Sequence, residues 1–258
     1  NYDGLYTNNS ATLYPVDSNS RPGQPENFRR PTVSYTIQTS RPDPGRPSHR
    51  PDRDDEPESL NTEDHVAYII GYTDGTVRPE GDIARSEVAT IFFRLLTDEA
   101  RAEYLTETSP FHDVASDAWY ATAVATMEAM GIVEGRAPAV FDPDAPITRG
   151  EFAAIAARFD SAPYDGADRF TDIGGHWAAE YINQAAVKGW VEGQPDGSFA
   201  PDRSISRAEA MTLVNRVLGR LPETADDLLD GMITWPDNPP DAWYYLAVQE
   251  ATNSHDYE

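Results

Sequence analysis

A tetrapeptide recurs along this chain at intervals of about 60 residues, and this periodicity limits the possible folds more than any other feature. Two copies read Thr148-Arg149-Gly150-Glu151 and Ser206-Arg207-Ala208-Glu209, and each follows an Ile and a Phe-x-Pro segment. A third, imperfect copy is Ala84-Arg85-Ser86-Glu87. Recurrence at fixed spacing indicates one supersecondary unit used several times. Repeats of this kind usually build a binding scaffold rather than a catalytic centre.

The two complete copies predict the same pair of helices. In the first of them, a helix opens near Trp119 and runs to Met130, and another begins at Thr148. In the next, the matching helices run to Lys188 and begin at Ser206. A Gly follows the first helix of each pair, as is usual for a helix C-terminus. Apolar residues spaced by three and four give each second helix one stripe to bury.

The imperfect copy lacks its front half, and that half is found at the other end of the chain. Trp235-Pro236-Asp237-Asn238 corresponds to Phe111-His112-Asp113-Val114. We therefore expect a ring of three units that closes when the chain ends meet; the alternative is a fourth, truncated unit outside the ring. The predicted division is a Pro-rich disordered linker (1–60), half of the first repeat (61–108), the second repeat (109–166), the third repeat (167–222) and the closing half-repeat (223–258).

Composition excludes several classes of protein. The net charge of −24 argues against a nucleic-acid partner, because phosphates must be neutralised by Lys and Arg. Zero Cys excludes disulfides, Cys-based zinc sites and thiol nucleophiles. No apolar run reaches the length of a membrane span, so we expect no membrane insertion. The chain begins at Asn1 without Met, so we expect a fragment or a processed product.

The ordered motifs of residues 61–258 resemble the bacterial surface-layer homology (SLH) domain, usually found as three tandem copies. The matching motifs are Phe-x-Asp-Val/Ile, a Trp at the start of the first helix, Asp-Gly-x-Phe-x-Pro, and Ile-Thr/Ser-Arg-x-Glu. Three departures are Ala84 for Thr/Ser, Val77 for Phe, and Pro138-Ala139-Val140 for the segment with Asp-Gly. The resemblance implies a mainly α fold, a pseudo-threefold trimer of helical repeats with short extended segments.

The resemblance also implies a function. A secreted protein of this family would attach non-covalently to the bacterial cell wall, within a surface layer, by binding an acidic secondary polysaccharide that often carries a pyruvate ketal. No enzymatic activity, cofactor or metal is expected. Self-assembly through regions outside this chain stays open.

Helix capping is predicted at two of the three tetrapeptides. The Ser/Thr-x-x-Glu spacing of Thr148 with Glu151, and of Ser206 with Glu209, is that of a capping box. Ala84 cannot cap through its side chain, so its helix start should be the weakest.

The arginine that follows each cap is harder to explain as structure. It occupies the first helical position, where the helix dipole disfavours a cation. A guanidinium beside free helix N–H groups would instead form a carboxylate site. The alternative is pairing with acidic residues between repeats. Side chains and glycines near the predicted clefts complete the candidate ligand-binding set, which is Arg85, Arg149, Arg207, Trp190, Tyr68, Tyr72, Gly71, Gly135 and Gly193.

Other recurring residues are assigned structural roles. The three Trp residues at the first helices are expected to anchor the core, with stacking on a sugar as the alternative; they are Trp119, Trp177 and Trp243. A second arginine series follows nine residues after the first and should point to the opposite helix face; it consists of Arg94, Arg158 and Arg216. The three candidate glycines favour a special backbone conformation over close approach of a glycan.

The sequence leaves three further functions to consider. Asp-rich segments such as Asp142-Pro143-Asp144 suggest calcium binding, but they lack the ligand set of an EF-hand loop. A structural protein–protein assembly module of a surface layer is the second. A glycan-active enzyme is the third, although nothing places one acid in an apolar pocket. His112 and His176 are not at metal-ligand spacing to each other.

Overall fold

The computed structural model describes residues 57–160 and 162–255. The predicted linker lies outside the described residues up to position 56. Its last residues, 57–60, are described, and Leu60 is buried in the core at 3 % exposure. The N–H of Asn61 donates to the carbonyl of Leu95. The packed region therefore begins a few residues earlier than the predicted repeat boundary.

The described residues form seven α-helices and isolated β-bridges, without a sheet. The prediction of a mainly α fold is confirmed. The helix α2 was not predicted, and the others begin and end close to the expected positions. Their bounds are α1 Arg85–Arg94, α2 Asp98–Tyr104, α3 Ala121–Ala129, α4 Arg149–Ala157, α5 Ala179–Val187, α6 Arg207–Val217 and α7 Tyr245–Thr252, with a 3-10 turn at Ala225–Asp227.

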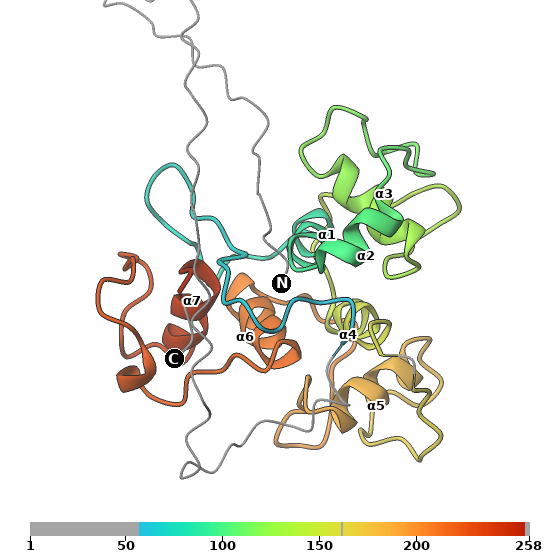
Figure 1. The fold of residues 1–258 in the computed structure, drawn as a ribbon. Helices are drawn as coiled ribbons and strands as arrows, with labels where there is room; N and C mark the ends of the chain where they lie inside the picture. The colour runs from blue at the N-terminus through green and yellow to red at the C-terminus, as the bar shows by residue number, and fades with distance from the viewer. Residues whose placement is uncertain (1–56, 161, 256–258) are drawn as a thin grey trace, which may run out of the picture. The chain divides into compact units, whose positions relative to one another are not determined.

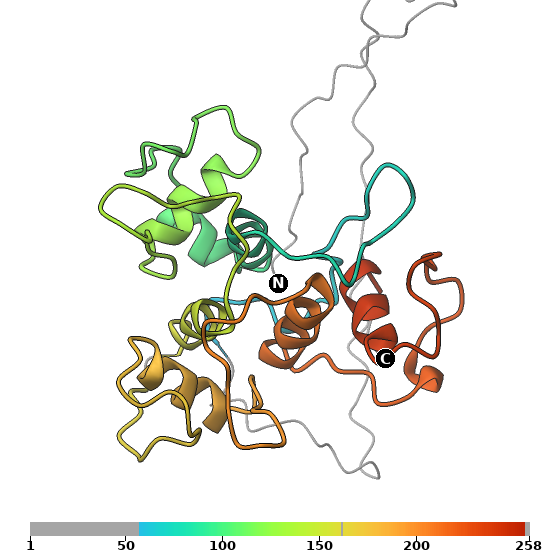
Figure 2. The ribbon, with the colours of Figure 1, turned by 180° about the vertical axis from the view of Figure 1, so that it is seen from behind.

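Three helices lie together at the centre and three lie outside them. The central ones, α1, α4 and α6, each begin with the recurring tetrapeptide (Figure 1). Helices α3, α5 and α7 pack against α1, α4 and α6 respectively, and the view from behind shows the same pairs (Figure 2). No helix of the described segments has the length and apolar character that a membrane crossing needs.

A cycle of three backbone hydrogen bonds joins the units at the centre. The N–H of Ile147 donates to the carbonyl of Ile83 (3.0 Å), that of Ile205 to Ile147 (3.1 Å), and that of Ile83 to Ile205 (3.4 Å). All three side chains are fully buried. Each Ile directly precedes the cap residue of a central helix. The repeated Ile therefore places three equivalent helix starts around one pseudo-threefold axis.

The Asp of each Phe-x-Asp motif holds a strained turn. The carboxylate of Asp172 accepts from the N–H groups of Phe199 and Ala200, both at 2.7 Å. Ala200 has φ 56°, a left-handed conformation that costs free energy for a residue with a Cβ. Asp113 does the same for Asp142, which has φ 62°. These motifs are thus anchors of the loop that leads into each central helix.

The same contact joins the two ends of the described region. Asp237 accepts from the N–H groups of Val77 (3.1 Å) and Arg78 (2.7 Å), and Arg78 has φ 51°. The N–H groups of Tyr68 and Ile69 donate to the carbonyl of Ala251. The half-repeats at the two ends are therefore in contact through the pairing seen inside the complete repeats.

Two complete capping boxes begin α4 and α6. Thr148 accepts from the N–H of Glu151, and Ser206 from that of Glu209, while each Glu side chain returns to the cap N–H. At Ala84 only the second half of the box is present, a 2.9 Å bond from its N–H to Glu87. The other hydrogen bond, from the N–H of Glu87 to a side chain at the cap, is missing because the Ala side chain has no acceptor.

We predict that Ala84→Ser raises the free energy of unfolding by about 0.5–2 kcal/mol, because the new hydroxyl would accept from the N–H of Glu87. The backbone of Ala84 (φ −79°, ψ 155°) already matches that of Ser206 (φ −79°, ψ 164°). Chemical denaturation measures the effect. Ser206→Ala should lower the free energy of unfolding by a similar amount. An Ala84→Ser variant whose free energy of unfolding equals that of the parent chain would contradict the prediction.

A second prediction tests the contact between the chain ends. Asp237→Ala should lower the free energy of unfolding by about 1–3 kcal/mol, because the N–H groups of Val77 and Arg78 lose their acceptor. Asp113→Ala removes the same contact within one repeat and is the matched control. Thermal unfolding of both variants measures the effect. If Asp237→Ala leaves the stability unchanged while Asp113→Ala lowers it, the ends are not joined in solution.

Candidate functional site

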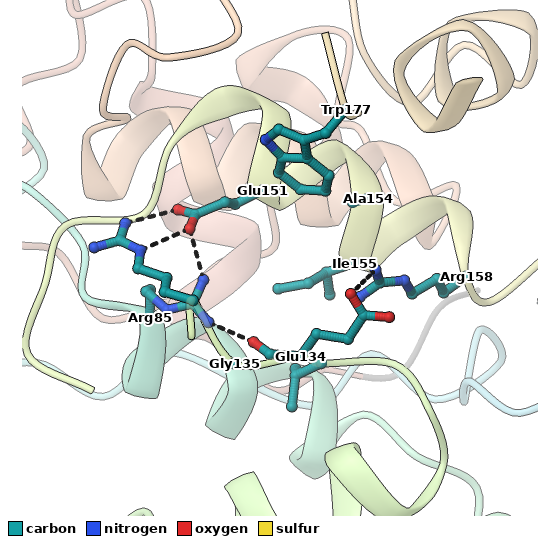
Figure 3. A pocket seen from close by; sticks show the side chains of 10 residues that line it. Arg85, Glu134, Gly135, Glu151, Ala154, Ile155, Arg158 and Trp177 are labelled. Carbon is teal, nitrogen blue, oxygen red and sulfur yellow. Dashed lines mark hydrogen bonds and ion pairs between the residues drawn. The ribbon is translucent and has the colours of Figure 1, made fainter. Parts of the chain in front are cut away.

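Two clefts lie beside the starts of central helices. The first has a volume of about 290 Å³ and lies between α1 and α4, with Arg85, Arg158 and Trp177 on its walls (Figure 3). The second has a volume of about 160 Å³ and is lined by Arg207, Arg94 and Trp119 in the equivalent places. Residues from neighbouring repeats thus meet in each cleft.

The arginine of each tetrapeptide is held by the next repeat. Arg85 donates from Nε to the carbonyl of Phe141 (2.9 Å) and from Nη2 to that of Glu134 (2.7 Å). Its guanidinium lies 4.6 Å from the centre of the Phe141 ring. Arg149 repeats both bonds at 2.7 Å, with the carbonyls of Phe199 and Glu192.

Charge pairing between repeats is confirmed for two of the three arginines. Arg85 forms an ion pair with Glu151 at 2.8 Å, and Arg207 forms one with Glu87. The three guanidinium side chains are buried, since Arg85, Arg149 and Arg207 are 5 %, 9 % and 4 % exposed. These arginines therefore join the repeats, and Arg85 and Arg207 also line the two clefts.

The expectation of free helix N–H groups beside these arginines is wrong. The N–H of Arg149 donates to the carbonyl of Arg203 (2.9 Å), and that of Gly150 to Pro201 (2.8 Å). The starts of α1 and α6 are occupied in the same way by carbonyls of a neighbouring repeat. Helix N-termini serve inter-repeat contact here, so an anion in a cleft would be bound by side chains.

The second arginine series lies on the opposite helix face, as predicted, and that face lines the neighbouring cleft. Arg158 reaches the first cleft, where its Nη2 pairs with Glu134 at 2.8 Å. Arg94 reaches the second cleft and donates to the carbonyl of Tyr68 (3.2 Å). Each cleft therefore contains one arginine from each of two neighbouring central helices.

The clefts are positive although the chain is strongly acidic. The lining of the first contains three arginines and two glutamates, because Arg136 joins Arg85 and Arg158. Burial alone would raise the pKa of Glu151, but hydrogen bonds from Arg136 and Thr148 and the charge of Arg85 outweigh it, so this pKa is lowered. Glu151 is thus ionised, and the lining still has a net positive charge in a chain of net charge −24.

The prediction that three Trp residues anchor the core is wrong. Trp119, Trp177 and Trp243 are 65 %, 58 % and 68 % exposed. They precede the first helical residue by two positions, and the residue after each Trp packs inward instead, such as Ala178 at 0 % and Tyr244 at 7 %. The indoles of Trp177 and Trp119 therefore lie at the first and second cleft.

Two aromatic candidates are buried in the core, and of these Tyr68 also borders the second cleft. Trp190 is 5 % exposed, and Tyr68 is 1 % exposed with its hydroxyl donating to the side chain of Asn215. Tyr72 is half-buried, and its ring lies 3.8 Å from the guanidinium of Arg78 and 5.1 Å from that of Arg207.

The three candidate glycines make room for aromatic rings. A Cβ at Gly193 would lie 2.4 Å from the Phe170 ring, and one at Gly71 would lie 2.2 Å from Trp235. Gly135, which also lines the first cleft, is equally crowded by the Val140 carbonyl (2.5 Å). None of the three has a positive φ, so the expectation of a special backbone conformation is wrong at these positions.

Comparison with known proteins gives a consistent family. The S-layer homology domain matches residues 110–153 and 169–211. The cellulosome-anchoring protein of Acetivibrio thermocellus is 33 % identical over 211 residues, which is 80 % of this chain and 46 % of that protein. Cell surface glycoprotein 1 of the same organism is 34 % identical over 207 residues (75 % of this chain, 9 % of that protein).

An enzyme is also similar. The amylopullulanase of Thermoanaerobacterium thermosulfurigenes is 33 % identical over 162 residues, which is 58 % of this chain and 8 % of that protein. The chain thus spans less than half the length of each of these relatives. The repeated motifs, the helical units and these matches agree: the chain carries an S-layer homology domain, with family repeats at residues 110–153 and 169–211.

Proposed function

We propose that the clefts between repeats bind an acidic polysaccharide of the bacterial cell wall and so anchor a surface protein without a covalent bond. The similar proteins include a cellulosome-anchoring protein and a cell surface glycoprotein. The observation that carries the proposal is the pairing of two arginines from neighbouring repeats in each cleft, Arg85 with Arg158 and Arg207 with Arg94.

The chemistry of each cleft suits a sugar that carries a carboxylate. Guanidinium groups donate bidentate hydrogen bonds to carboxylates, and they are charged at every physiological pH. An exposed indole, such as that of Trp177, offers an apolar face for the C–H surface of a sugar ring. A pyruvate ketal on the polymer would supply the carboxylate next to such a ring.

Three equivalent sites would make the attachment firm. The third set of residues is Arg149, Arg216 and Trp243, and Arg216 pairs with Glu192 at 2.9 Å as Arg158 pairs with Glu134. Weak binding at linked sites gives an avidity that exceeds each single affinity by orders of magnitude. A long polymer chain with repeated acidic groups is the ligand that can use several clefts together.

The Asp residues that suggested calcium binding have other partners. Asp142 pairs with Arg136 at 2.9 Å, and Asp196 accepts from the N–H of Ser198 at 3.0 Å in a turn. The proposal therefore rests on the arginine-lined clefts. The chemistry of a surface enzyme, as in the amylopullulanase relative, would belong to another part of such a protein, which this domain would hold at the wall.

We predict that Arg158→Gln weakens binding of wall polysaccharide by about 10- to 100-fold at the first cleft, the expected loss for one charge-assisted hydrogen bond. Arg158 is a sharper target than Arg85, because Arg85 also joins two repeats. Calorimetry with soluble polymer fragments measures the effect. Arg169→Gln, at an exposed arginine outside the two described cleft linings, is the matched control.

A further prediction distinguishes the contribution of the carboxylate to binding from that of the sugar ring. Mild acid removes ketals, and the treated polymer should bind the parent chain more weakly than the untreated one. Trp177→Ala should weaken binding of both polymers and keep the ratio between them, whereas Arg158→Gln should reduce that ratio toward one. Equal retention of treated and untreated polymer by the parent chain would contradict the ketal part of the proposal.

A further inference from the structure

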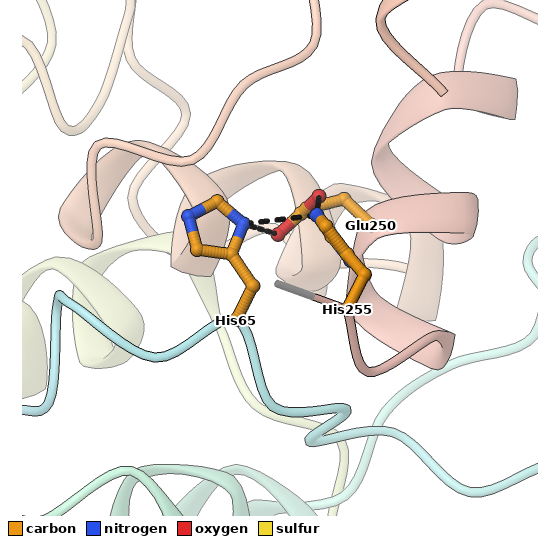
Figure 4. Close-up of side chains that lie close together, drawn as sticks. All are labelled: His65, Glu250 and His255. Carbon is orange, nitrogen blue, oxygen red and sulfur yellow. Dashed lines mark hydrogen bonds and ion pairs between the residues drawn. The ribbon is translucent and has the colours of Figure 1, made fainter. Parts of the chain in front are cut away.

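Three potential metal ligands from the two ends of the described region meet at one point. His65 lies just before residues 66–70, Glu250 lies on α7, and His255 follows α7 in the chain (Figure 4). The distances are 2.9 Å from His65 Nδ1 to Glu250 Oε1, 3.1 Å from His65 Nδ1 to His255 Nε2, and 3.3 Å from His255 Nε2 to Glu250 Oε2. We propose that these residues bind a zinc ion that joins the two half-repeats at the ends of the described region.

The spacing of the ligand atoms fits a tetrahedral metal. With metal–ligand bonds of about 2.0–2.2 Å, the edges of a coordination tetrahedron are about 3.3–3.5 Å long. His65 Nδ1 lies 2.9 Å from Glu250 Oε1 and 3.1 Å from His255 Nε2, and both distances are slightly below this length. An ion bound through one oxygen of Glu250 would therefore need only small outward shifts of these side chains. Two imidazoles and a carboxylate are a ligand set that zinc uses, and three protein ligands leave the fourth position to water.

The His255 ring is turned so that Nε2 faces the other two ligands. Its Nδ1 lies 3.4 Å from the carbonyl of Asn253, and its Nε2 lies 3.1 Å from His65 Nδ1 and 3.3 Å from Glu250 Oε2. A zinc ion at this point would meet one nitrogen of each imidazole and a carboxylate oxygen.

Burial and local charge also favour a cation. Glu250 has a side-chain exposure of 4 %, and both histidines have 11 %. A nearly buried carboxylate is stabilised by a cation beside it, and a zinc ion between the two imidazoles would supply that charge.

The position of the site gives it a structural role. His65 and His255 are 190 residues apart in the chain, and a backbone bridge pairs them directly. Metal bound only by the folded chain stabilises the fold, since the ligands are not gathered in the unfolded state. The zinc ion would therefore hold the two half-repeats together. This inference does not depend on what the clefts bind.

Calorimetric titration of the untagged chain with zinc chloride tests the proposal. We expect one zinc per chain and a rise of the unfolding temperature that EDTA reverses. His255→Ala and His65→Ala should each weaken zinc binding by about 100-fold or more, since even the loss of an outer-shell partner costs about 10- to 100-fold. His176→Ala is the matched control, because that histidine pairs with Asp202 elsewhere and its loss should leave zinc binding unchanged.

Zinc binding that survives in both variants, or a parent chain that binds no zinc, would overturn the inference. Circular dichroism without metal checks that the variants are folded. If a variant fails to fold, the visible spectrum of the parent chain with cobalt decides, because intense bands indicate four-coordinate geometry and weak ones six-coordinate geometry. A weak, six-coordinate spectrum contradicts the site, and so does an intense spectrum that is unchanged in Glu250→Gln.

Discussion

The buried arginine at the start of each central helix is the interaction on which the rest of the structure depends. A guanidinium that is almost fully buried must donate its N–H groups to protein acceptors, because an unpaired buried charge costs several kcal/mol. Arg85 and Arg149 find these acceptors in the backbone of the next repeat. One side chain therefore fixes the position of a whole neighbouring unit and, with it, one wall of the cleft.

This arrangement makes the structural role of the arginine compatible with the proposed binding role. Arg85 joins two repeats and also lines the first cleft. Its unfavourable place in the helix dipole is offset by Glu151, which caps α4 and pairs with Arg85 at 2.8 Å. The same Glu thus completes a capping box in one repeat and neutralises a cation from another. Arg158, on the opposite face of α4, pairs with Glu134 at 2.8 Å and adds a third guanidinium to the lining of the first cleft.

Sequence reasoning succeeded where a pattern is local and failed where it depends on the assembled ring. The helices, the caps at Thr148 and Ser206, and the opposite faces of the two arginine series follow from spacing alone. The exposure of Trp177 does not, because a Trp just before a helix has no periodic register that assigns it to a face. The contact between His65, Glu250 and His255 was not predicted, because His65 and His255 are 190 residues apart and their meeting depends on how the two half-repeats are paired.

The closure of the ring and the binding sites are physically coupled. Tyr68, Ile69 and Ile70 line the second cleft, and the N–H groups of the first two donate to the carbonyl of Ala251 in α7. Separation of the chain ends would therefore release this wall of the second cleft. The first cleft, built from α1, α4 and the loop at Glu134, would keep its lining. Linked sites bind a polymer far more firmly than one site. Under the proposed function, the contacts near His65 would therefore influence the strength of attachment without touching the ligand.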